Sequence, residues 1–489
     1  MLAVTASVCQ CNFTAARGVG FAELSPILCA VFLRDDPMVL HRTLYKAVLC
    51  CVFSALTAPL FAQRTGPSPV LATPPVAAQG TGGHLDPNAA TQAYLATLPS
   101  EKKAQSDAYF GGGYWLILWD FVVIALIYIA MLATGLSARM RDTAERMTAS
   151  PTLRSALYGV LFIVVTTVAS LPWTIWEGYV REHSYGLSNL KFGAWIVEQA
   201  KGFGISLVIG TLLIAGLYAI VRRLPRTWWV WGAIAGIAFA FIAIVVSPVV
   251  IVPMFNSPTK LADARVVDPI LRLARQNGID ATAVWEIDAS KQSKRISANV
   301  SGALGTERIT LNDNLLNRAS LEEIEAVMGH EMGHYVLNHV YKGLMAFAII
   351  IVIGFGVVAW LFERLRARYE PSWKVRDIGD PAGLPLVSLL FAGYLFLMTP
   401  VLNTITRTQE YEADVFGLNT ARQPDGFAQT AIKLSEYRKL DPGPWEERIF
   451  FDHPSGRTRI YTAMRWKAEN LPTARDATTP SASSASGNP

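Results

Sequence analysis

Two histidines four residues apart, with a glutamate directly after the first, are the residues of this sequence best suited to chemistry: His330, Glu331 and His334. On an α-helix, side chains at positions i and i+4 project from one face about one turn apart, so both imidazoles can bind one metal ion. The carboxylate between them then lies beside an open coordination position, where it can act as a general base. The pattern predicts a catalytic zinc site. A polar helix face with two unrelated histidines is the alternative.

A helix start precedes this motif. Ser320 and Glu323 have the spacing of a capping box, in which the serine accepts a backbone N–H and the glutamate reaches back to the serine's own N–H. The two histidines are therefore expected in the middle of a helix. His339 is nine positions after His330, which is about 900° of helix rotation, so we expect it on the opposite side in a structural role.

A third metal ligand must come from elsewhere, because catalytic zinc sites combine three protein ligands with a water. The acidic cluster at residues 410–414 follows the apolar segments on a helical stretch. Glu410 and Asp414 share a face four residues apart, so Glu410 can bind zinc while Asp414 orients a ligand histidine. Glu412 is rotated by about 200° from Glu410 and cannot serve as the ligand in the same helix. A solvated acidic helix start is the alternative reading.

The composition indicates the elements that must position these residues. Hydrophobic residues make up 52% of the 489 residues and charged residues 17%, with a mean hydropathy of +0.30, as in a polytopic membrane protein. The net charge of +5 is small and its Lys and Arg residues lie beside apolar runs, which argues against nucleic-acid binding. All five cysteines lie before residue 52, so the rest of the chain can form neither a disulfide nor a thiolate metal site. Six segments are long enough to cross a bilayer: 114–136, 155–176, 203–221, 228–252, 343–362 and 383–404.

The ends of the chain have a different character. Residues 44–62 follow a basic start after Met38 and are predicted to be a signal sequence, with an uncleaved anchor as the alternative. Both Met1 and Met38 are candidate starts. Residues 1–62 are thus a leader, residues 63–110 are expected to be a flexible linker rich in Pro, Ala and Gly, and residues 471–489 a disordered tail.

Two polar regions interrupt the membrane region, and together they predict one small α/β domain split around two spans. The first has a helix near 269–276 that ends at Asn277-Gly278, and strand-like runs at 284–287, 296–301 and 308–311. The second is mainly helical. The predicted parts are therefore a four-span membrane region, the first half of the zinc domain, two spans and the second half: 111–255, 256–341, 342–404 and 405–470.

With these residues in hand, the chain resembles the type I CAAX prenyl endopeptidases, membrane zinc metalloproteases related to the yeast a-factor-processing enzyme. The resemblance covers about residues 110–466. Its matching segments occur in the family's order: Leu171-Pro172-Trp173, the loop at 182–189, Pro253-Met254-Phe255-Asn256, Ser290-Lys291 with Asn299, residues 308–311, residues 330–339, residues 407–414 and His453-Pro454 with Arg459. The sequence departs from the family at Thr406 and Ser455, and its only counterpart of the family's first span is the signal-like segment 44–62.

The resemblance implies a gluzincin-type zinc endopeptidase. It assigns Glu410 as the third ligand of one zinc ion and His453 as a hydrogen-bond donor to the oxyanion, with a helix-capping role as the alternative for His453. The strand around Asn299 is expected to bind peptide by edge pairing. Arg407 and Arg459 are expected as partners of carboxylates rather than as catalysts.

The implied partners are peptide or protein substrates, with lipidated or membrane-embedded ones among the candidates, and the lipid bilayer. In a bacterium, with the protein in the inner membrane, the resemblance implies general proteolysis of membrane or misfolded proteins. The Arg- and Lys-rich loops after the first, third and fifth spans favour a zinc site outside the cytoplasm, whereas eukaryotic family members are understood to cut on the cytosolic side. A membrane scaffold or chaperone-like protein with a structural zinc is the alternative, against which the intact Glu331 argues. A metal transporter is a further one, and Asp120 is the main ionisable residue in the spans, too little for an ion path.

Overall fold

The computed structural model describes residues 85–301 and 307–471. The predicted signal segment and tail, and residues 63–84 of the predicted linker, lie outside these ranges. Six helices have the length and apolar composition of membrane spans: α4 (Ser100–Ala133), α6 (Pro151–Ile175, continued to Ser184), α8 (Phe192–Arg223), α9 (Trp228–Val246), α14 (His339–Trp373) and α15 (Leu384–Ala421). They correspond one to one with the six predicted spans, and they make the protein a multi-pass membrane protein.

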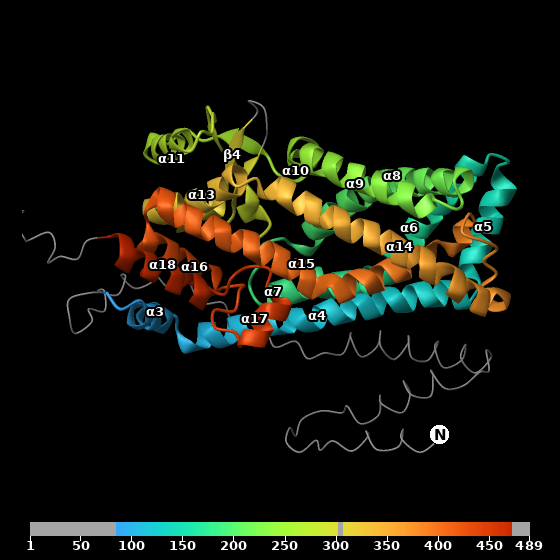
Figure 1. Cartoon of the computed structure of the whole chain (residues 1–489), viewed down its shortest axis with the longest axis horizontal. Helices are drawn as coiled ribbons and strands as arrows, with labels where there is room; N and C mark the ends of the chain where they lie inside the picture. Colours follow the sequence, from blue (N-terminus) through green and yellow to red (C-terminus); the bar gives the residue numbers. More distant parts are fainter. Residues whose placement is uncertain (1–84, 302–306, 472–489) are drawn as a thin grey trace, which may run out of the picture. The chain divides into compact units, whose positions relative to one another are not determined.

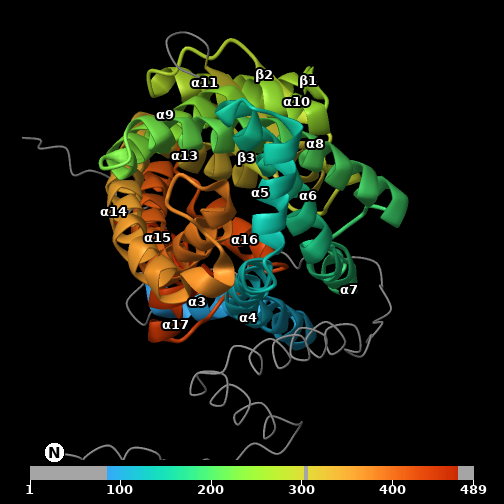
Figure 2. The same cartoon turned by 90° about the vertical axis from the view of Figure 1, so that its right-hand side faces the viewer.

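These six helices contact one another in a closed sequence, α9–α14–α15–α4–α6–α8–α9, which can be followed around the bundle in Figure 2. Their outer faces carry apolar side chains such as Leu212 and Ile349, exposed as expected for groups that meet lipid. At one end of the bundle α5 (Leu136–Met147) and the short turn Pro381–Gly383 close the structure, and Arg141 there forms a buried ion pair with Asp380 at 2.6 Å.

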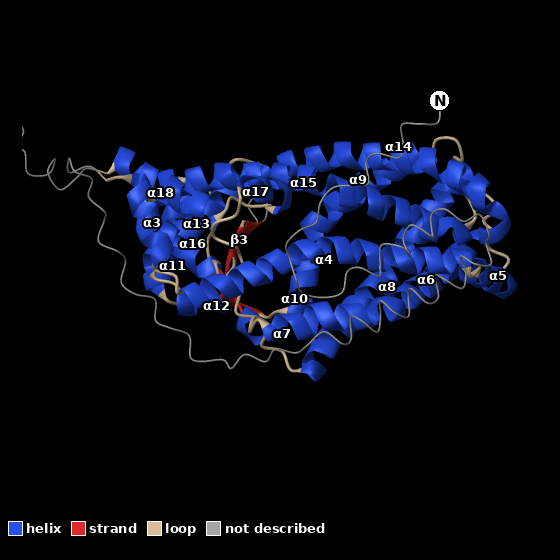
Figure 3. Cartoon of the chain, turned by 90° about the horizontal axis from the view of Figure 1, so that it is seen from below, coloured by secondary structure: helices blue, strands red, loops and turns tan. Residues whose placement is uncertain are grey.

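A small mixed sheet lies near the other end of the long helices (Figure 3). Its strand order is β1-β2-β4-β3, with β1 (Pro258–Lys260), β2 (Val284–Ile287), β3 (Ala298–Ser301) and β4 (Arg308–Asn312). β2 and β4 are parallel and the outer pairs are antiparallel, so among the described residues β3 is an edge strand. Three of these strands match the predicted runs. The three-residue β1, which begins at a proline, was not predicted.

Helices surround this sheet, and the remaining short helices connect it to the bundle. The amphipathic α11 (Ala264–Gln276) ends at Asn277-Gly278 as predicted, because Gly278 adopts a φ of +71° that favours glycine. α13 (Leu321–Val336) begins with the predicted capping box. The others are α7 (Glu182–Ser184), α10 (Val252–Phe255), α12 (Asp313–Arg318), α16 (Pro424–Leu434), α17 (Pro444–Phe450) and α18 (Gly456–Asn470).

The prediction of a flexible linker through residue 110 is wrong for its second half. The chain is helical in α3 (Pro87–Ala96) and again from the first turn of α4 at Ser100. Tyr94 packs into a buried cluster with Phe427 and Met464, and its hydroxyl donates a hydrogen bond of 2.7 Å to Asp425. Tertiary packing therefore stabilises a helix whose Ala- and Pro-rich composition gave no clear periodicity.

Two of the three predicted boundaries between spans and zinc domain, at 341/342 and 404/405, fall inside continuous helices, whereas the one at 255/256 coincides with the end of α10. α14 begins at His339, and α15 continues from the membrane region to Ala421, so that it carries residues 410–414 itself. Figure 1 shows α15 running alongside α13 at the end where the sheet lies. One helix thus connects the last span to the acidic half of the candidate site without a hinge.

Candidate metal centre

The site is built where α13 and α15 approach each other through small residues. A Cβ atom on Gly417 would lie 2.7 Å from the backbone nitrogen of His330, and one on Gly333 would lie 3.1 Å from the Cα of Ala413. Both distances are shorter than ordinary van der Waals contacts, so these positions accept glycine alone without displacement. The close approach brings the histidines of α13 within reach of the carboxylates of α15.

Three side-chain atoms converge between the two helices. His330 Nε2 lies 3.1 Å from His334 Nε2 and 3.3 Å from Glu410 Oε2, and His334 Nε2 lies 3.4 Å from Glu410 Oε1. Two ligands of a tetrahedral ion bound at about 2.0–2.1 Å are about 3.3 Å apart, which these three distances approximate. Two imidazole nitrogens and one carboxylate are also a ligand set that zinc accepts. The side chains that the sequence proposed as ligands therefore fit one zinc ion, and each is at most partly exposed.

Asp414 and Arg459 contact two of the three candidate ligands. The Nδ1 atom of His330 lies 2.8 Å from Asp414, whose side chain is 1% exposed. Arg459, at the start of α18, lies 2.9 Å from Glu410 and 3.1 Å from Asp414, so one guanidinium balances two buried carboxylates. The structure thus puts Asp414 and Arg459 where the sequence analysis expected partners of the ligands.

The electrostatics of the site favour a cation at His330. Burial alone would lower the pKa of His330, but hydrogen bonds to the carboxylates of Asp414 and Glu410 outweigh it and raise the pKa to about 9. Groups that stabilise a proton on this imidazole also stabilise a metal ion bound to it.

Glu331 is half-buried on the helix that carries both histidines. Burial raises the pKa of its carboxyl, while the nearby charges of His330 and His334 lower it less strongly. A raised pKa brings a carboxylate closer to the range in which it can both accept and return a proton at neutral pH.

The expectation that His339 points away from the site is wrong. It assumed a continuous helix, but α13 ends at Val336 and Asn338 adopts a left-handed conformation with a φ of 57° before α14 begins. This turn brings the Nδ1 atom of His339 to 3.0 Å from the Nδ1 atom of His334. Glu412, which is not one of the converging ligands, lies 3.0 Å from the other ring nitrogen of His339.

His453 also lies beside Glu410, with its Nε2 atom 3.2 Å from Oε2 of that carboxylate. Asp452 lies 2.8 Å from its Nδ1 atom, and Arg438 lies 3.3 Å from its Nε2 atom. Burial lowers the pKa of His453 more than the hydrogen bond to Asp452 raises it. The sequence analysis named neither Asp452 nor Arg438, and no motif could have found Arg438, which is 15 residues before His453 in the chain.

Arg407 does not contact a ligand carboxylate, contrary to the expectation for it. Its guanidinium donates instead to backbone carbonyls at the end of α17, those of Glu447 and Phe451. This contact fixes the segment that leads into His453. The unpaired carbonyls of a helix C-terminus attract a cation, as carboxylates do. Sequence alone cannot distinguish these two kinds of partner for an arginine.

Asn299 lies on the edge strand β3, and its side chain is exposed. β3 pairs with β4 on one side, while α13, the helix with the two ligand histidines, packs against β3. An extended peptide that added to this edge would run beside the metal centre.

Two family models match consecutive parts of this chain. One described as CAAX prenyl protease N-terminal, five membrane helices, matches residues 88–257, and one for peptidase family M48 matches residues 260–467. Four of the helices long enough to span a membrane, α4, α6, α8 and α9, lie in the first of these ranges, and the signal-like segment 44–62 lies outside the described residues.

Individual proteins are similar over most of their length. The uncharacterized metalloprotease YhfN of Bacillus subtilis is 30% identical over 354 residues, which are 72% of this chain and 82% of that protein. CAAX prenyl protease 1 of Saccharomyces cerevisiae is 25% identical over 320 residues, 62% of this chain and 70% of that protein. The crystal structure of Saccharomyces mikatae Ste24p has a similar fold, with a TM-score of 0.64 and 21% identity over 75% of this chain and 90% of that one.

Proposed function

The chain belongs to peptidase family M48 and is a membrane metalloendopeptidase of the CAAX prenyl protease type, and from this we propose that it works with one zinc ion held by His330, His334 and Glu410. The observation that carries the proposal is the convergence of three ligand atoms at 3.1–3.4 Å from one another. When bound, zinc would supply Lewis-acid activation of the scissile carbonyl and of water.

The chain's own residues divide the remaining work. Glu331 takes a proton from the attacking water and returns it to the leaving amine, a role supported by its position between the two histidines and by its raised pKa. His453 donates a hydrogen bond to the oxyanion, supported by its position beside Glu410. The β3 edge holds the substrate backbone and therefore accepts varied sequences.

Glu331→Gln tests this assignment, because it removes the proton carrier and leaves the three ligands. We expect one zinc ion per chain by elemental analysis and a loss of at least about 10²-fold in turnover of a fluorogenic peptide. The matched control is Glu325→Gln on the same helix, whose carboxylate contacts Gln423 rather than the ligands. Activity of the Glu331 variant within about tenfold of the unmodified protein would contradict the role of Glu331.

The substrates we propose are peptides or proteins at the membrane, lipidated or embedded in it. Edge pairing on β3 would recognise the backbone of the substrate and gives no reason to require one lipid. Mass spectrometry of the products from matched prenylated and unprenylated peptides would distinguish a prenyl-dependent enzyme from a general membrane protease.

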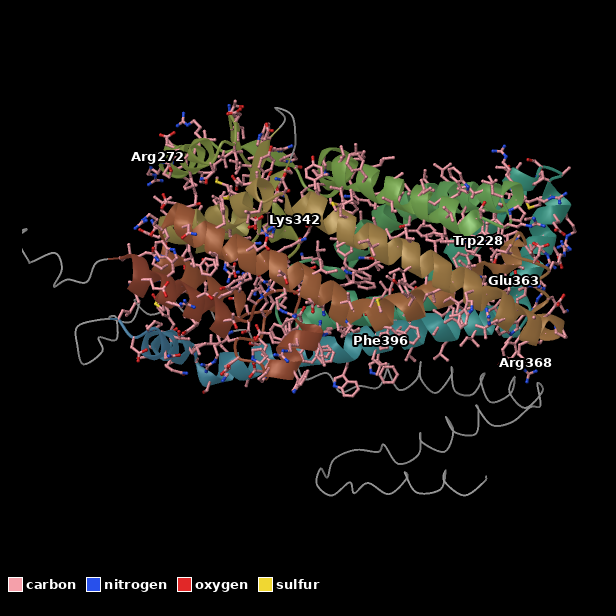
Figure 4. The ribbon with its side chains drawn as sticks, in the orientation of Figure 1. Trp228, Arg272, Lys342, Glu363, Arg368 and Phe396 are labelled. Atoms are coloured by element: carbon pink, nitrogen blue, oxygen red, sulfur yellow. The ribbon has the colours of Figure 1, made fainter. Side chains whose placement is uncertain are left out.

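We further propose that the metal centre faces away from the cytoplasm, in the inner membrane of a bacterium. The argument rests on the Arg- and Lys-rich loops at the end of the bundle opposite the sheet. Figure 4 labels one exposed residue near each end: Arg272 on α11 and Glu363 on α14. In intact spheroplasts Arg272→Cys should react with an impermeant maleimide and Glu363→Cys should not, and the reverse pattern would put the site in the cytoplasm.

A further inference from the structure

The two ligand histidines have different partners behind them. His330 is held by Asp414, which is buried and paired with Arg459. His334 is held by another imidazole, that of His339, whose side chain is 3% exposed. In the first arrangement a carboxylate contacts the histidine directly. In the second another histidine lies between His334 and the carboxylate of Glu412.

The positions of the ring nitrogens determine where the protons lie in the series of hydrogen bonds from His334 through His339 to Glu412. His334 directs Nε2 towards the other ligands, so a metal ion would take the lone pair of Nε2 and the proton of His334 would be on Nδ1. That N–H faces His339 Nδ1 at 3.0 Å and must donate to it. The proton of His339 is then on Nε2, which lies 3.0 Å from Glu412 Oε2 and donates to it. With neutral imidazoles, this is the single arrangement in which every donor faces an acceptor.

This series of hydrogen bonds ends at the protein surface rather than in the core. The side chain of Glu412 is 43% exposed and that of Lys342 is 51% exposed, and the Lys342 ammonium lies 3.0 Å from the Glu412 oxygen that accepts from His339. Lys342 is near the start of α14, where this helix leaves the metal centre (Figure 4). Lys342 and Glu412 form an ion pair, so the relay ends in a carboxylate oxygen that can accept from His339.

We propose that His339 and Glu412 are positioning residues that form a hydrogen-bonded relay to the ligand His334 and strengthen its hold on the metal. The relay fixes the tautomer and ring orientation of His334 and increases the electron density on its ligand nitrogen, as partners of ligand histidines do in metal sites generally. The inference rests on the proposed zinc centre but concerns metal affinity, and not the proton transfer by Glu331.

Three replacements of His339 separate hydrogen bonding from packing. His339→Asn keeps an amide oxygen near the Nδ1 position, where it can accept from His334. His339→Leu fills similar space without an acceptor, and His339→Ala provides neither. We expect zinc affinity, measured on the purified full chain by competition with a chelator, to fall about 10–100-fold for Leu and Ala and clearly less for Asn. Equal losses for Asn and Leu, or a greater loss for Asn, would overturn the relay in favour of simple packing.

Glu412→Gln tests the outer end without disturbing a buried position. We expect a smaller loss of zinc affinity in the same direction, and a changed absorption spectrum when Co²⁺ replaces zinc. Glu363→Gln is the matched control, since it removes an exposed carboxylate of α14 that pairs with Arg366 far from the site. If Glu412→Gln and the control leave affinity and spectrum equally unchanged, Glu412 has no part in the relay. The two proposals are tested separately. Glu331→Gln tests the proton transfer through turnover with zinc affinity unchanged, whereas the His339 and Glu412 variants test the relay through zinc affinity.

Discussion

Glycines in two regions of the molecule have opposite surroundings. One region is the contact between α13 and α15, and the other is the outer surface of α8. In the α13–α15 contact, Gly417 is buried and the space of its missing side chain is taken by the backbone of His330. On α8, Gly216 is exposed, and apart from its chain neighbours and the nearby backbone of α8 itself no atom lies within 4 Å of the position a Cβ would occupy. The difference shows that a small residue matters where two backbones must approach closely, and the proposed metal centre needs that approach because its three proposed ligands come from two helices.

The two regions also differ in the number and burial of their charged residues. Around the metal centre, Glu410 and Asp414 are buried and share one arginine, whereas the middles of the long helices carry few charges and expose apolar groups instead. A buried charge is stable only when it is paired, so each removal near the metal should have a large effect.

The largest effect is expected for Glu410→Ala, which removes a proposed ligand and leaves Arg459 without one of its two carboxylates. Zinc affinity should fall by more than the about 10–100-fold that the loss of an orienting partner costs. Chelator competition on the purified protein measures this loss. An affinity within tenfold of the unmodified protein would show that Glu410 does not bind the metal.

A smaller effect is expected for the glycine pair. Gly417→Val inserts a branched side chain against the backbone of α13 and should lower the free energy of unfolding by about 1–3 kcal/mol or more, as overpacking does. Gly216→Val should leave stability within about 0.5 kcal/mol, as surface changes do. Thermal unfolding in detergent, followed with zinc content, compares them. Equal destabilisation by the two variants would contradict the distinction between the two regions.

The pH dependence of zinc binding gives a further test, of about tenfold for each pH unit. With its pKa near 9, His330 carries a proton at neutral pH in the metal-free protein, and zinc must displace that proton. Apparent zinc affinity should therefore fall about tenfold from pH 8 to pH 7, whereas a histidine with the ordinary pKa of 6.5 would change it by less than twofold. Zinc-buffered titrations at the two pH values decide between these outcomes.

Much of the architecture could be predicted from local pattern. Apolar length identified all six spans, and alternating apolar runs identified three of the four strands. The capping box at Ser320 located the helix of the two histidines, because capping is a local interaction between residues three apart. The spacing of Glu410 and Asp414 likewise placed both carboxylates on one face of a helix.

The misplaced residues depended on tertiary contacts or on a single backbone angle. His339 was put on the wrong side because an asparagine in the left-handed region interrupts the helix, and asparagine is also common in uninterrupted ones. The partners of Arg407 and Arg438 could not be predicted from local pattern, since they lie 40–44 and 15 residues away along the chain. The helix α3 depends on packing against residues more than 300 positions later.

An anomalous difference map at the zinc absorption edge, from crystals of the full chain, tests the central claim most directly. We predict one peak per chain, about 2.0–2.2 Å from Nε2 of His330, Nε2 of His334 and a carboxylate oxygen of Glu410. A peak bound by Glu412 or His339 in place of one of these three, or a zinc-loaded and active protein without a peak between α13 and α15, would contradict the account.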